Sequence, residues 1–137
     1  MGSSGTCKTM LASDIATEMI SRGAATVTVS AFDMVKRAKD YHTQFAIEDY
    51  RDLFTPMLDC DLLVIDDLGT ETILKNITHE YFYTLINERW LRRRNTVITS
   101  NLSPNDLIKR YGEAVFSRLC DKTKAELFIV AAKNARI

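Results

Sequence analysis

Residues 2–9 read Gly-Ser-Ser-Gly-Thr-Cys-Lys-Thr and lead directly into a segment with helical periodicity. The stretch fits the phosphate-loop pattern G-x-x-x-x-G-K-[ST] except at the second glycine, where Cys7 stands. The free backbone N–H groups and the positive dipole end of the following helix favour a phosphate. We therefore expect a nucleotide site with these contacts: Gly2, Ser3, Ser4, Gly5, Thr6, Cys7, Lys8 and Thr9.

Two side chains of this loop carry its predicted chemistry. Lys8 is expected to reach the terminal phosphates, and the Thr9 hydroxyl is expected to ligate Mg²⁺. Cys7 departs from the pattern, because glycine allows positive φ and close approach of the backbone to a ligand. A side chain at this position is expected to weaken ATP binding. The alternative interpretation is a Gly/Ser-rich turn before a helix, without a nucleotide.

Size and composition limit the class of protein. With 137 residues, of which 46% are hydrophobic, the chain suits a single domain over residues 1–137. Eighteen basic and eighteen acidic residues give no net charge, so nucleic-acid binding would need a local patch. Three cysteines without a CxxC pair indicate a reducing compartment, and no apolar run is long enough for a bilayer. We expect a cytoplasmic protein without a membrane contact.

Hydrophobic periodicity predicts helices that alternate with strands. The expected helices cover 8–22, 32–42, 47–58, a span from Asn76 or Thr78 to 93, 104–111 and 116–119. The expected strands cover 25–30, 62–65, 96–99 and 127–131. This order predicts an α/β fold with a parallel sheet and helices on both faces. Only Met1 precedes the phosphate loop, where a buried strand is usual. We thus expect an N-terminally trimmed domain.

Two carboxylates follow the apolar run at 62–65. Asp66 and Asp67 would lie at the carboxyl end of a buried strand, where open α/β sheets bind ligands. We expect Asp66 to hold Mg²⁺ and Asp67 to orient or deprotonate the attacking water, with Glu71 as a second candidate base. The alternative is a solvated acidic turn that leads into Gly69 and Thr70.

Asn101 ends the next predicted strand. Its amide would enter the same crevice and position water against the terminal phosphate. The alternative role is a cap or turn before Ser103 and Pro104, which are expected to open the helix at 104–111.

With these three motifs, the chain resembles the helicase-loader branch of the AAA+ ATPases, the DnaC/IstB-like group. The most specific stretches are 62–71, 86–89, 99–103 and 116–119. The resemblance implies a P-loop AAA+ fold, ATP and Mg²⁺ as cofactors, and ATP bound between neighbouring subunits. It also implies loading of a replicative helicase onto single-stranded DNA. Arg118 matches an arginine finger that acts on the adjacent subunit, and Arg136 matches a second sensor arginine.

Several alternatives remain at this stage. Arg118 could be an ordinary exposed helix residue, and Arg136 could form a surface salt bridge. DNA contacts would come from basic residues and stacking faces, namely Lys36, Arg37, Lys39, Arg89, Arg92, Arg93, Arg94, Phe32, Tyr41 and Phe45. The run 92–94 also suits a helix C-terminus. The competing functions are a catalytically weakened nucleotide-binding or assembly module and a transposition helper of the IstB kind.

Overall fold

The computed structural model describes residues 1–43, 54–74, 78–121, 123 and 125–130, apart from the side chains of 41 and 42. Its elements follow the predicted alternation of helix and strand. In chain order they are α1 (Lys8–Ser21), β1 (Thr26–Ser30), α2 (Ala31–Thr43), α3 (Thr55–Asp59), β2 (Leu62–Leu68), α4 (Thr78–Leu91), β3 (Asn95–Ser100), α5 (Pro104–Tyr111) and α6 (Glu113–Leu119).

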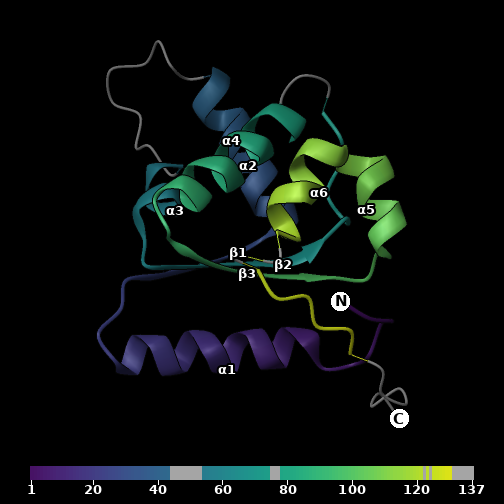
Figure 1. Ribbon diagram of the computed structural model, residues 1–137. Coiled ribbons are helices and arrows are strands. Elements are labelled where there is room, and N and C mark those ends of the chain that lie inside the picture. Colours follow the sequence, from purple (N-terminus) through teal and green to yellow (C-terminus); the bar gives the residue numbers. More distant parts are fainter. Residues whose placement is uncertain (44–53, 75–77, 122, 124, 131–137) are drawn as a thin grey trace.

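The three strands form a parallel sheet in the order β1-β2-β3. Among the described elements, α1 covers one face of the sheet and the other helices lie on the opposite side (Figure 1). This is the predicted α/β arrangement with helices on both faces. It brings the carboxyl ends of all three strands to one edge, close to the start of α1 (Figure 1).

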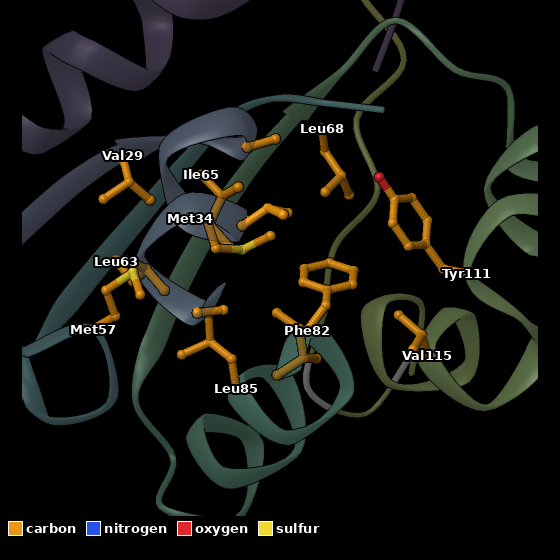
Figure 2. Packing of buried hydrophobic residues seen from close by; sticks show 14 of the residues in the cluster. Val29, Met34, Met57, Leu63, Ile65, Leu68, Phe82, Leu85, Tyr111 and Val115 are labelled. Carbon is orange, nitrogen blue, oxygen red and sulfur yellow. The ribbon is translucent and has the colours of Figure 1, made fainter. Parts of the chain in front are cut away.

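The unbroken apolar run of β2 is explained by burial on both faces. Leu63 and Ile65 belong to the larger core, which they share with α2, α4 and α5 (Figure 2). Leu62 and Val64 instead contact Ala12 of α1 in a smaller cluster. Since successive side chains of a strand point to opposite faces, both faces of β2 need apolar residues.

The helix at α5 begins as its sequence predicted. The Ser103 hydroxyl accepts a hydrogen bond from the Asp106 N–H, and Pro104 occupies the first turn. The predicted helix at 47–58 is described only as α3, and its earlier part lies outside the described residues, as does Asn76. Helix α4 begins at Thr78.

The strand predicted at 127–131 is wrong for its described part, because residues 127–130 belong to no strand. Instead, Val130 N–H donates to the Met1 carbonyl oxygen at 2.7 Å, and the Met1 amino group donates to the Phe128 carbonyl oxygen at 2.7 Å. Gly2 N–H donates to Ser100 O of β3 at 3.3 Å. Two consecutive residues thus connect this segment to the sheet, Met1 on the segment side and Gly2 on the β3 side, and these few bonds do not make a hydrogen-bonded ladder.

Within the part of the chain that the structure describes, no helix combines the length and apolar character needed to cross a bilayer.

Candidate nucleotide-binding site

The phosphate loop ends in a left-handed residue. Cys7 is the N-cap of α1 and has φ 58° and ψ 23°. An L-residue with a Cβ is disfavoured there by about 1–2 kcal/mol, whereas glycine is not. The structure therefore confirms that the Cys7 position has the backbone conformation for which the pattern reserves glycine.

Lys8 is folded back onto this loop. Its Nζ donates to the Ser3 carbonyl oxygen at 2.6 Å and to the Thr6 hydroxyl at 3.0 Å, and the side chain is buried. The Thr6 hydroxyl in turn donates to Ser3 O at 2.9 Å. These bonds hold the lysine against the loop, with its ammonium group beside the Ser3 carbonyl oxygen and the Thr6 hydroxyl, which a phosphate oxygen can replace as partners.

A β-bulge lies at the acidic end of β2. Ile65 pairs with Ile98 and Leu68 with Ser100, so that two residues of β2, Asp66 and Asp67, face the single residue between those partners. Strand β2 therefore continues past the predicted end at residue 65. Bulges re-aim side chains at the rims of sheets. Asp67 adopts φ 55°, which turns its side chain out of the regular alternation.

Thr99 fills the space opposite this bulge. Its hydroxyl accepts from the Asp67 N–H at 2.9 Å and donates to Asp66 Oδ1 at 2.5 Å. It thereby fixes both carboxylate-bearing residues. Thr99 is a site residue that no sequence motif marks, although its position at the end of the neighbouring parallel strand was an available signal.

The phosphate loop and the acidic strand end meet directly. The Thr9 hydroxyl donates to Asp66 Oδ1 at 3.1 Å. A cleft of about 610 Å³ opens beside this contact, and the residues that line it are Ser4, Gly5, Thr6, Cys7, Lys8, Thr9, Met10, Ser13, Asp67 and Asn101. The structure thus brings Lys8, Asp67 and Asn101 to one cleft, with Asp66 immediately behind Thr9.

The oxygen atoms at this junction suit Mg²⁺. A hydroxyl and a carboxylate are hard ligands, and Mg²⁺ is usually held by one or two such protein groups together with substrate phosphates. In the described part of the chain, no group of three or more His, Cys, Asp or Glu side chains could hold a metal alone. The donor set at Thr9 and Asp66 therefore fits a magnesium ion that arrives with a nucleotide.

A family model described as IstB-like ATP binding protein matches residues 1–134. The chain belongs to this family. The IstB-like domain is 29% identical over 122 residues to the replicative helicase loader DnaC of Escherichia coli K12, covering 86% of the chain and 47% of that protein. DnaC of Shigella flexneri gives the same values. The chain spans about half the length of these curated relatives.

Solved structures show the same fold as this IstB-like domain. The DnaC helicase loader superposes with a TM-score of 0.79 at 27% identity, covering 95% of this chain and 75% of that one. AMPPCP-bound DnaA from Aquifex aeolicus gives a TM-score of 0.75 at 23% identity, covering 97% of this chain and 39% of that one. The chain is thus an ATP-binding domain with the AAA+ fold of the helicase-loader group.

Glu71 of the IstB-like domain lies away from the cleft. It is 2% exposed, and it does not line the cleft beside Asp67. Its carboxylate accepts from the Gly69 N–H at 2.8 Å and from the Tyr111 hydroxyl, with Arg110 Nε 3.5 Å from Oε1. This burial favours Asp67 over Glu71 as the candidate base.

Arg118 is held on the α4 side of α6. Its Nε donates to Asn87 Oδ1 at 3.3 Å, and its guanidinium carbon lies 5.7 Å from the centroid of the Trp90 ring and 6.0 Å from that of Tyr83. Arg118 does not line the phosphate cleft of its own chain. Arg136 lies outside the described residues.

The predicted basic patch after Glu88 is smaller than its sequence suggests. Arg89 is 1% exposed and bonds to backbone carbonyls, so it is not a surface residue. Arg92 pairs with Asp59 at 2.9 Å and Arg94 pairs with Asp61 at 2.5 Å. On α2, the exposed candidates for DNA contacts are Phe32, Lys36 and Lys39, whereas Phe45 and the Tyr41 side chain lie outside the described part.

Proposed function

We propose that this chain is an Mg²⁺-dependent ATPase domain, spanning residues 1–137, that acts as a helicase-loader-like protein in DNA replication. In this role, ATP binding is coupled to loading of a replicative helicase onto single-stranded DNA. The observation that carries the proposal is the Thr9–Asp66 contact beside the cleft that Lys8, Asp67 and Asn101 line. The cysteine pattern suits the cytoplasm as the place of action.

The residues have distinct roles in this proposal. The main-chain N–H groups from Gly5 to Thr9 and the start of α1 bind the phosphates. Lys8 exchanges its two loop partners, the Ser3 carbonyl oxygen and the Thr6 hydroxyl, for phosphate oxygens, while Thr9 and Asp66 would hold Mg²⁺. When bound, Mg²⁺ supplies charge stabilisation to the phosphoryl oxygens.

Asp67 and Asn101 act on the attacking water. The Asp67 carboxylate accepts its proton, and the Asn101 amide orients it toward the terminal phosphate. The half-buried Asp67 is pre-positioned by the bulge, so that little rearrangement is needed at the reacting centre. Arg118 completes the site of an adjacent subunit. Its place outside the cleft of its own chain is consistent with action in trans.

Binding of a fluorescent ATP analogue in Mg²⁺ tests the first step. Lys8→Ala is expected to abolish binding, whereas Lys109→Ala, an exposed lysine of α5, is the matched control and should bind normally. Asp67→Asn is expected to lose turnover and to retain binding. Binding that is absent, or that does not respond to Lys8→Ala, would refute the proposal.

Mixing two inactive variants tests the role of Arg118. Subunits with Arg118→Ala keep an intact acidic site, and subunits with Asp67→Asn keep the finger. Mixtures should regain part of the activity if the arginine acts across an interface. Inactivity at every mixing ratio would argue against a role in trans.

The left-handed Cys7 favours a second candidate function, that of a catalytically weakened nucleotide-binding or assembly module. In that case the chain binds ATP weakly or without turnover. A transposition helper of the IstB kind has the same chemistry and differs in its partner. Co-purification with a replicative helicase, compared with a transposase, separates these two roles.

A further inference from the structure

Glu71 stands out as a buried carboxylate without a part in the proposed chemistry. Its side chain has no exposed surface, although it lies only a few residues beyond the acidic end of β2. Burial of a carboxylate is unfavourable unless hydrogen bonds and charges compensate for the lost water. The partners of Glu71 therefore indicate what the fold gains from placing it there.

One oxygen of Glu71 holds the turn that follows Asp67. Oε2 accepts from the Gly69 N–H at 2.8 Å. On the other side of the turn, the Thr70 hydroxyl donates to the Asp67 carbonyl oxygen at 2.8 Å. Asp67 itself has φ 55°, a conformation that a non-glycine residue keeps only when its surroundings impose it. The Glu71 carboxylate is one of these constraints.

The second oxygen of Glu71 is tied to α5. Oε1 accepts from the Tyr111 hydroxyl, and Arg110 Nε lies 3.5 Å away, while Arg110 Nη2 donates to the Glu71 carbonyl oxygen. The Tyr111 ring is buried against Phe82, with centroids 5.0 Å apart (Figure 2). Burial and the bond to Glu71 raise the pKa of Tyr111, so it remains a hydrogen-bond donor.

We propose that Glu71 is a positioning residue for ATP hydrolysis. Its bonds to Tyr111 and Arg110 on α5 and to the Gly69 N–H, together called the clamp, hold the turn that orients the Asp67 carboxylate. The inference rests on the proposed ATPase function and adds three residues to it. Release of the clamp lets Asp67 relax from its left-handed conformation, and its carboxylate then leaves the position from which it orients water. Nucleotide binding depends on the separate loop at Gly5 to Thr9 and stays intact.

Two substitutions break the clamp at opposite ends. Glu71→Gln places an amide where Gly69 and Tyr111 both require an acceptor, and Tyr111→Phe removes the hydroxyl while it keeps the ring in the core. Ser103→Ala is the matched control, because it removes the N-cap of the same helix without touching Glu71. Turnover, nucleotide affinity and melting temperature are measured for each variant of the full chain.

We expect kcat to fall by about tenfold or more in Glu71→Gln, with nucleotide affinity within about twofold of the unsubstituted chain. Tyr111→Phe gives a smaller loss in the same direction. Ser103→Ala lowers the melting temperature but leaves kcat unchanged. Amide exchange at Gly69 should accelerate in Glu71→Gln, a readout that does not need turnover.

The outcomes separate the two proposals. An unsubstituted chain that does not hydrolyse ATP refutes the ATPase function. Turnover in the unsubstituted chain that Glu71→Gln and Tyr111→Phe leave unchanged overturns the positioning role alone. The same follows if Ser103→Ala lowers kcat as much as Tyr111→Phe at equal stability loss, or if Gly69 stays protected in Glu71→Gln. If Glu71→Gln does not fold, Tyr111→Phe decides the question.

Discussion

Polar groups at the two ends of the sheet have different surroundings, since those at one end are paired internally and those at the other face a cleft. At the amino ends of the strands, the Arg89 guanidinium donates to the carbonyl oxygens of Met57 at 2.7 Å, Cys60 at 3.0 Å and Asn95 at 2.5 Å. At the carboxyl ends, Asp67 and Asn101 face an open cleft, and two residues, Cys7 and Asp67, have left-handed backbones. The amino end is saturated by internal hydrogen bonds, although Arg93 beside it is also left-handed, and the carboxyl end combines strain with open polar groups.

The open polar groups at the carboxyl ends support the proposal that ATP is hydrolysed there. Backbone strain and polar groups aimed at a cleft lower stability, and they persist at functional sites because the surrounding structure imposes them. Substitutions at the amino end should therefore change stability, and those at the carboxyl end should change function more than stability.

Among these substitutions, Arg89→Ala, at the amino ends of the strands, should cause the largest loss of stability. It leaves several buried carbonyl oxygens without a donor and opens a cavity, so we expect a loss of about 3–5 kcal/mol in the free energy of unfolding. Urea denaturation measures it. Arg92→Ala is the control, because Arg92 forms exposed ion pairs that contribute about 0–1 kcal/mol. Equal losses in the two variants would contradict the stabilising role of the Arg89 hydrogen bonds.

Thr99→Val should have an intermediate effect at the functional end. It removes the acceptor for the Asp67 N–H and the donor to Asp66, at a cost of about 1–3 kcal/mol in stability. Turnover should fall further than this stability loss explains, because both carboxylates lose their orientation. Denaturation and steady-state kinetics on the same samples check this, and a variant with normal kcat would remove Thr99 from the site.

Alkaline pH should lower the free energy of unfolding through Tyr111. Its folded-state pKa is raised above the usual 10.0 by burial and by the bond to Glu71. Above pH 10 the unfolded chain releases this proton while the folded chain keeps it, so the free energy of unfolding decreases as pH rises. The slope from one such group is at most about 1.4 kcal/mol per pH unit. Melts from pH 8 upward should show a shallower decline in Tyr111→Phe, and parallel curves would refute this.

Cys7→Gly should give the smallest change in stability. Relief of the left-handed conformation is offset by the greater freedom of glycine in the unfolded chain, which leaves a gain of about 0.5–1 kcal/mol. Nucleotide affinity should rise if the side chain obstructs the phosphates. Thermal melts and titration with an ATP analogue measure both, and unchanged affinity would show that the side chain is tolerated.

The sequence predicted the sheet and its covering helices because their signals are local. The apolar run of β2 and the Ser103–Pro104 cap each reflect nearby residues. The contact between Thr9 and Asp66 followed from parallel topology, which brings strand ends together. The site roles of the individual residues remain predictions.

The bulge at Asp66 and Asp67 was not predictable, since it depends on register with β3. The buried role of Arg89 was also missed, because an arginine followed by three more within five positions looks like a solvated helix end. Two of its carbonyl partners, those of Met57 and Cys60, are around thirty residues away in sequence. The hydrogen bond between Glu71 and Tyr111 was not predicted for the same reason, because it joins residues that are far apart in the sequence and share no local pattern.

The three thiols of the domain differ in accessibility, so a reagent can label the phosphate loop selectively at Cys7. Cys7 is exposed on the cleft, Cys60 is buried beside Arg89, and Cys120 is partly buried, with a pKa raised by burial. Because the thiolate is the reactive form, a maleimide should alkylate Cys7 first in the folded protein. The rate of that single labelling reaction, with and without nucleotide, would report occupancy of the loop without any engineered probe.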